Sequence, residues 1–183
     1  AMRPRGGTTS ETLTSATPVA PLLGKLRDET GDILTPSHTQ KGNQRHYYYV
    51  SNRLISGKPD PTGWRLPAKA LEKAVTHAIA DHLRTAAQRY QILISSDALM
   101  SSAAADAMLG LVEEINARGA KALSTILKSG TISGEQLQLH LSPSYLSKIL
   151  NLPTEELDKN LYKIDVPFAI RRRGVEMKIL AGE

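Results

Sequence analysis

Basic side chains and tyrosines gather in one short part of the sequence. The run Tyr47–Tyr49 stands among cations on both sides, which are Lys25, Arg27, Lys41, Arg45, His46, Arg53, Lys58 and Arg65. A flexible cation that contacts a phosphate releases counterions, and tyrosines add hydrogen bonds to phosphates and apolar contacts with sugars or bases. The pattern indicates nucleic-acid binding. It also fits a second interpretation, in which tyrosines fill a thin core and the cations keep the surface soluble.

A second basic cluster lies near the end of the chain and consists of Arg171, Arg172 and Arg173. The flanking residues predict a β-hairpin with these arginines at its tip. An exposed tip of this kind can contact DNA phosphates, but charged tips also protect edge strands from aggregation. Both interpretations stay open at this point.

The sequence carries no recognisable catalytic or metal-binding pattern. It has no cysteine, which excludes thiolate nucleophiles, disulfides and cysteine-based zinc sites. No serine lies in a Gly-x-Ser-x-Gly turn, and no phosphate-binding glycine loop occurs. His77 and His82 would diverge by about 140° on a helix, whereas His38 and His46 flank one loop and could meet across a ribbon. We predict no catalytic site, no metal and no cofactor.

Length and composition are those of a soluble globular protein. The 183 residues include 23 basic and 18 acidic side chains, for a net charge of +5, and 40% of the residues are hydrophobic. That charge suits a polyanionic partner without requiring one. No apolar run approaches the ~20 residues that span a bilayer, and the N-terminus lacks the features of a signal peptide. We therefore expect neither a membrane partner nor secretion.

The pattern predicts an α+β fold that begins with a small antiparallel β-ribbon. Residues 1–20 are rich in Gly, Pro, Ser and Thr and read as a flexible lead-in. Residues 21–66 form the predicted ribbon unit, with about three short strands within 22–51 and a connector that contains Trp64. Such a ribbon is thin and needs a surface to pack against.

Residues 67–183 are predicted to form a two-helix hairpin followed by a mixed β segment. Apolar residues recur every four positions from Leu71 to Leu83, which predicts a helix from Pro67 to about Ala87. A second helix is expected from about Asp97 to Gly119, whose glycine suits a C-terminal cap.

Beyond Gly119 the apolar period changes from helical to alternating. The alternation predicts paired strands at Leu123–Lys128 and Gln136–Ser142. Ser142 and Pro143 then resemble the start of a short helix that runs through Leu150. The chain is expected to close with a β-hairpin.

Several of these segments resemble the ribbon region of large serine site-specific recombinases, in the branch whose ribbon has lost its zinc-binding cysteines. The resemblance rests on Leu22–Leu26 with Asp28, on Leu34–His38, Arg45–Ser51 and Leu66–Ala68, and on Val166–Phe168 with Arg171–Lys178. It is specific over about 22–70 and 164–180 and loose between them. In that family an N-terminal catalytic domain carries the serine nucleophile and two DNA-binding domains follow, of which this chain resembles only the last.

The resemblance implies sequence-directed binding of duplex DNA during integration, excision or resolution, in the cytoplasm of a bacterium at the nucleoid. It implies further recombinase subunits as partners. Asp28 stands where the family ribbon has its first cysteine, so apolar packing and backbone pairing must replace the metal. The two predicted helices are short for the family's projecting coiled-coil arm, and a packed hairpin is expected instead.

We expect the cations and tyrosines of the ribbon to share one DNA-facing surface. The predicted phosphate contacts are Lys25, Arg27, Lys41, Arg45 and Arg53, with His46 and either Tyr47 or Tyr49 nearer the bases. The alternative is a protein-interaction module that mediates dimerisation or synapsis, with an incidental basic surface. Apolar residues exposed on the outer face of either long helix would favour that alternative.

Overall fold

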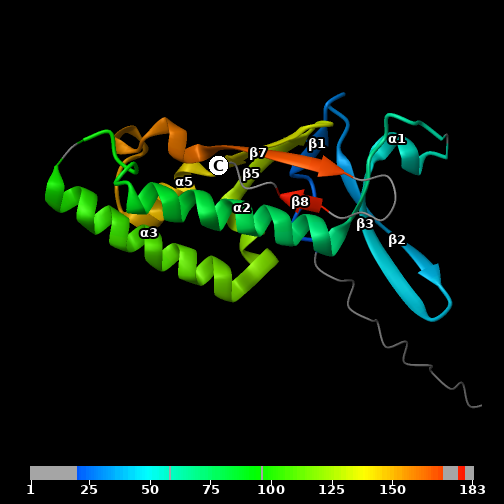
Figure 1. The fold of residues 1–183 in the computed structure, drawn as a ribbon, viewed down its shortest axis with the longest axis horizontal. Helices are drawn as coiled ribbons and strands as arrows, with labels where there is room; N and C mark the ends of the chain where they lie inside the picture. The colour runs from blue at the N-terminus through cyan, green and yellow to red at the C-terminus, as the bar shows by residue number, and fades with distance from the viewer. Residues whose placement is uncertain (1–19, 58, 96, 171–176, 180–183) are drawn as a thin grey trace, which may run out of the picture.

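The computed structural model describes residues 20–57, 59–95, 97–170 and 177–179. The predicted lead-in 1–20, apart from Ala20, and the cluster Arg171, Arg172 and Arg173 lie outside the described residues. Within them the fold is α+β, as predicted, and Figure 1 shows its elements. In chain order the strands and helices are β1 Leu26–Asp28, β2 Leu34–Lys41, β3 Gln44–Ser51, α1 Asn52–Ile55, β4 Arg65–Pro67, α2 Ala68–Gln88, α3 Ala98–Arg118, α4 Leu123–Ile126, β5 Leu127–Ile132, β6 Gln136–Leu141, α5 Pro143–Leu150, β7 Lys163–Ile170 and β8 Met177–Ile179.

A five-stranded mixed sheet has the strand order β1-β5-β6-β7-β8. β1 runs parallel to β5, and the other neighbours are antiparallel. β1 was expected to belong to the ribbon, but Leu26 instead lies in this sheet beside Gly130 of β5. A Cβ atom on Gly130 would stand 2.7 Å from the Leu26 side chain, so this close approach of the two strands depends on the glycine.

The ribbon is a separate antiparallel sheet with the order β2-β3-β4. Its third strand comes from the predicted connector rather than from the start of the chain, because Leu66 pairs with Tyr49. Pro36 lacks a backbone donor and is tolerated because β2 lies at the edge of this sheet. β4 continues directly into α2, which ties the ribbon to the helices.

The two long helices agree closely with the prediction. Leu71, Val75, Ile79 and Leu83 of α2 are all buried, as the four-residue spacing indicates. α3 begins after Asp97, whose side chain accepts a hydrogen bond from the Met100 backbone N–H, and ends at Gly119 with φ +57°. The two helices pack against each other as a hairpin, and buried apolar side chains of both helices lie in this core.

The segment after α3 differs from the prediction. Leu123–Lys128 was expected to be a strand, but its first four residues form α4, and β5 continues through Ser129 to Ile132. Leu123, Ile126 and Leu127 are buried at a helical i, i+3, i+4 spacing. A bulge between Leu127 and Ser129 then shifts the strand alternation, which hides β5 in the sequence.

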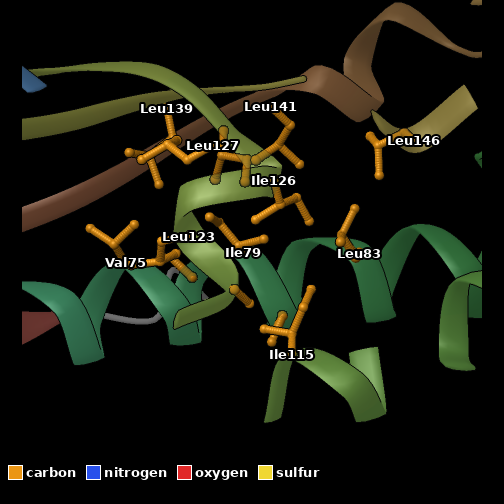
Figure 2. Close-up of a cluster of buried hydrophobic side chains, with 14 of the residues drawn as sticks. Val75, Ile79, Leu83, Ile115, Leu123, Ile126, Leu127, Leu139, Leu141 and Leu146 are labelled. Carbon is orange, nitrogen blue, oxygen red and sulfur yellow. The ribbon is translucent and has the colours of Figure 1, made fainter. Parts of the chain in front are cut away.

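α2 is the central layer of the core. Figure 2 shows Val75, Ile79 and Leu83 of α2 between Ile115 of α3 on one side and residues of the α4–β6 region on the other. Leu34, Tyr49 and Leu66 of the ribbon belong to the same buried cluster. The ribbon therefore has the packing surface that it needs, but only at the end nearest α2.

Candidate nucleic-acid interface

The β2–β3 hairpin extends away from the rest of the molecule at one end of its long axis (Figure 1). Its tip, which we define as residues 38–47, is exposed except for the half-buried His46. Gly42 and Asn43 form the two-residue turn between the paired Lys41 and Gln44. Gly42 has φ +60° and Asn43 does not have a positive φ, which is the pattern of a type II′ hairpin turn.

The strand register divides the hairpin side chains between two faces. Paired residues of an antiparallel ladder share a face, and successive residues alternate. One face, called here the Arg45 face, carries Pro36, His38, Gln40, Arg45, Tyr47 and Tyr49. The other, the His46 face, carries Ser37, Thr39, Lys41, Gln44, His46 and Tyr48. The expectation of a single shared face is wrong, because Arg45 and Tyr47 lie opposite Lys41 and His46.

The same register separates His38 from His46. The two histidines were considered as a pair that could meet across the ribbon, but each lies on a different face. His38 instead approaches Tyr47, with ring centroids 5.9 Å apart. On the His46 face, the Arg65 guanidinium lies 4.2 Å from the centre of the Tyr48 ring, a cation–π contact.

Tyr49 is a core residue rather than a base-contacting one. Its side chain is 1% exposed, and its hydroxyl accepts a hydrogen bond from the Leu22 backbone N–H at 3.2 Å and donates to Glu72 Oε1 at 2.8 Å. Burial, together with the bond to Glu72, raises the pKa of Tyr49. The prediction for Tyr49 is corrected, because alternation turns this tyrosine inward where the ribbon meets α2.

Arg53 is likewise engaged inside the molecule. Its guanidinium forms ion pairs with Asp28 at 2.5 Å and with Asp32 and Asp60 at 3.1 Å each. It also donates to the carbonyl oxygen of Thr62 at 2.9 Å. Three carboxylates therefore already engage this arginine, and the phosphate contact expected of Arg53 stays a prediction.

The centre of this network is the buried carboxylate of Asp28. It accepts hydrogen bonds from the Thr30 N–H and hydroxyl, from the Asp32 N–H, from the Ser51 hydroxyl and from Arg53. Burial by itself would raise the pKa of Asp28, but these hydrogen bonds outweigh it and lower the pKa to about 2. Hydrogen bonds to the Asp28 carboxylate thus connect β1 with the turn that follows it and with the end of β3, in addition to the apolar packing that was expected.

Lys25 immediately precedes β1 and Arg27 lies within it, away from the hairpin tip. Lys25 is half-buried, and its Nζ donates to the Leu127 carbonyl oxygen at 2.5 Å. Burial lowers the pKa of Lys25. Arg27 is exposed and donates to the Gly31 carbonyl oxygen at 2.9 Å. The structure does not bring either residue together with the tip.

Lys41, Arg45 and His46 differ from these residues, since none of them forms an ion pair with a described residue. No acidic residue lies near them in the sequence either, since none occurs between Asp32 and Asp60. Among the described residues, the tip thus presents Arg45 on one face and Lys41 on the other with neither in an ion pair. Of the predicted phosphate contacts, Lys41 and Arg45 keep a geometry suited to that role, and Tyr47, which is 38% exposed, is the tyrosine placed near them.

The prediction overlooked three amide side chains at the tip, Gln40, Asn43 and Gln44. Glutamine and asparagine amides can donate and accept at once, which suits the edge of an adenine, as arginine suits that of a guanine. Gln40 is tied to the Gly42 carbonyl oxygen at 3.2 Å. The available signal was the Gly42-Asn43 pair between β-prone runs, which predicts a turn and places the flanking amides at its exposed end.

Other chemistry-bearing groups do not converge. Among the described residues no group of three or more His, Asp or Glu side chains could hold a metal ion. His77 pairs with Asp81 at 3.0 Å, and His82 Nε2 lies 3.1 Å from the Leu161 carbonyl oxygen. None of the helices among the described residues has both the length and the apolar character of a membrane span.

Comparison with known proteins adds no relative from which a role could be transferred. No family model, curated protein or solved structure matches this chain significantly. The functional argument therefore depends on the residues themselves and on the resemblance described above.

Proposed function

We propose that this chain binds duplex DNA through the tip of the β2–β3 hairpin. The observation that carries the proposal is a projecting two-stranded ribbon on which Lys41 and Arg45 form no ion pair with a residue that the structure describes. Neighbouring strands lie about 4.8 Å apart, and the major groove is about 12 Å wide and admits such a ribbon. Both faces of an inserted hairpin lie near a DNA backbone, so a basic residue on each face is suited to this mode of binding.

Within the groove, the tip can both position the protein and read bases. Lys41 supplies a point charge for a phosphate, while Arg45 can contact either a phosphate or a guanine edge. Gln44 lies beside the turn and is exposed, which suits contact with an adenine. Tyr47 adds apolar contact with a sugar or base. This division of roles is sequence-directed DNA binding.

The resemblance to large serine recombinases extends the proposal to a biological role. In that role the chain is the C-terminal DNA-binding region of a site-specific recombinase, acts on a recombination half-site in the bacterial cytoplasm at the nucleoid, and works with other recombinase subunits. The serine nucleophile belongs to the family's N-terminal domain, so no serine of this chain has that role. DNA binding by the hairpin does not depend on this extension.

The test measures affinity for a random-sequence duplex against salt concentration by fluorescence anisotropy. Each lost phosphate contact lowers the slope of log affinity against log salt by about 0.9. We expect the double variant K41A/R45A to lower the slope by about 1.8. The matched control is K148A/K159A, which removes two exposed lysines from α5 and the segment after it. This control should leave the slope within about 0.9 of wild type.

Equal slopes for K41A/R45A and wild type would contradict DNA binding through the tip. An equal loss in both double variants would also contradict it, because net charge alone would then explain the binding. Thermal melting of each variant checks that the substitutions leave the fold intact.

A second candidate function is supported by apolar side chains at the other end of the molecule. Tyr90, Ile94 and Leu99, near the connection between α2 and α3, are 61%, 65% and 85% exposed. This end lies opposite the hairpin along the long axis (Figure 1). Exposed apolar residues of this kind favour a protein contact, such as dimerisation or synapsis between recombinase subunits.

Sedimentation tests this second candidate directly. If the patch forms a contact between copies, the mass of the wild type rises with concentration, and I94S/L99S remains monomeric. A wild type that stays monomeric throughout would contradict self-association. Salt dependence of DNA binding should be the same for I94S/L99S and wild type, which separates the two candidate functions.

A further inference from the structure

We infer that one DNA backbone lies in the hollow between the Arg45 face and the first turns of α2, where Lys69 and Lys73 contact its phosphates. This inference rests on the proposed function and deepens it. It adds a second basic surface, separated in sequence from the hairpin, to the DNA-binding site.

The hollow is a cavity of about 630 Å³ at the base of the hairpin tip. Its wall is mostly apolar and includes Leu23, Pro36, His38 and Tyr47 together with Lys69 of α2. Leu23 is 63% exposed, so the apolar surface is open to solvent. A sugar–phosphate backbone matches this wall, because its deoxyriboses are partly apolar and its phosphates are charged.

A second hollow of about 430 Å³ continues along α2. Lys69 and Glu72 line both hollows, and Lys73 and Asn116 line the second. The two hollows therefore adjoin at Lys69 and Glu72, and together they line a path from the hairpin to the end of α3. Lys69 and Lys73 lie one helical turn apart, about 6 Å along the axis, and both are exposed on the path.

The acidic groups beside this path are already engaged. Glu72 is half-buried and accepts the hydrogen bond from the Tyr49 hydroxyl. Asp81, one turn beyond His77, is paired with His77 and with Arg84. The charge of Lys69 also acts on Glu72, but neither Lys69 nor Lys73 forms an ion pair with a described residue, and both exposed ammonium groups can meet an anion.

The path also explains why the hairpin is basic on both faces. A ribbon inserted in a groove has one DNA backbone on each side. The backbone beside the His46 face would meet Lys41 and Arg65, which is held over Tyr48. The backbone beside the Arg45 face would enter the hollow and meet Lys69 and then Lys73.

The experiment adds K69A/K73A to the salt-dependence series on the same duplex. We expect it to lower the salt slope by about 1.8, as for two lost phosphate contacts. The variant K69R/K73R keeps both charges and should restore the wild-type slope, whereas K148A/K159A is the charge-matched control. All substituted lysines are exposed, so the variants should melt as the wild type does.

The outcomes separate this inference from the proposed function. If K41A/R45A lowers the slope and K69A/K73A behaves as the control, the α2 path is wrong and hairpin binding stands. If K69A/K73A alone lowers the slope, the inference is overturned as well, because the backbone does not then run beside the hairpin. If neither variant changes the slope, both the function and the inference are wrong.

Discussion

The two ends of the β2–β3 hairpin use similar residues in opposite ways. At the base, Tyr49 and Arg53 are engaged with Glu72 and Asp28 inside the molecule. At the tip, Arg45 and Tyr47 have the same residue types but no acidic partner among the described residues. The base connects the ribbon to α2 and β1, whereas the tip is an exposed surface that can contact a ligand.

The difference shows that a cation becomes a candidate DNA contact only after its acidic neighbours are counted. Asp28, Asp32 and Asp60 surround Arg53 in the fold although they flank it at 25, 21 and 7 residues in the sequence. The cations at the tip form no ion pair within the described part of the chain. Substitutions at the base should therefore change stability, and substitutions at the tip should change DNA binding.

The largest effect is expected from breaking the buried ion pair at the base. Asp28→Ala removes the acceptor of the hydrogen bonds from Thr30, Ser51 and Arg53, and a buried donor left without an acceptor costs about 1–3 kcal/mol. Arg53 keeps Asp32 and Asp60 as partners, so we expect a loss of about 3 kcal/mol. Urea unfolding measures the free energy directly. The matched tip variant Arg45→Ala should change it by less than about 0.5 kcal/mol. Equal losses at the two positions would remove the contrast between base and tip.

Acid should weaken the base through the same carboxylate. The pKa of Asp28 is lowered from 3.8 to about 2 in the folded protein, so folding favours its ionised form. This contribution is fully present above about pH 4 and is lost as pH falls towards 2, for a total of about 2 kcal/mol. The stability advantage of wild type over Asp28→Asn should shrink by that amount on acidification. An advantage that stays constant with pH would contradict the stabilised carboxylate.

A smaller effect should distinguish the two tyrosine hydroxyls. Tyr49→Phe removes the acceptor of the Leu22 N–H and the donor to Glu72, and we expect a loss of about 1–2 kcal/mol. Tyr47→Phe, at the exposed tip, should change stability by less than about 0.5 kcal/mol. Thermal unfolding of the pair measures both, and a Tyr49→Phe variant as stable as the wild type would show that its hydrogen bonds contribute nothing.

The long helices were predictable because apolar residues recur regularly, over about three turns from Leu71 to Leu83 in α2, and the caps at Asp97 and Gly119 follow local rules. The strand β1 was misplaced because its partner, β5, lies about a hundred residues later, and no local pattern encodes that pairing. α4 was predicted as a strand because its four residues span only about one helical turn, so the helical spacing of apolar residues does not repeat. Short elements of this kind are set by tertiary packing.

The candidate site was predictable in composition but not in geometry. The sequence shows cations and tyrosines together, and Lys41, Arg45 and Tyr47 all lie at the hairpin tip, but Lys41 is on the opposite face from the other two. Whether a tyrosine points outward depends on strand register, which turned Tyr49 into the core. The engagement of Arg53 depends on Asp28, which lies 25 residues earlier and reaches it only in the fold. Lys69 and Lys73 were overlooked because they look like ordinary solvent-facing positions on a helix.

The most direct test of the account is a titration of the isotope-labelled protein with a duplex at low salt, followed through its backbone amide NMR signals. The account predicts shifts concentrated in residues 38–47 and around Lys69 and Lys73, with the amides of α5 unchanged. Shifts confined to the region around Tyr90–Leu99, or no shifts at any concentration of duplex, would contradict DNA binding by the hairpin.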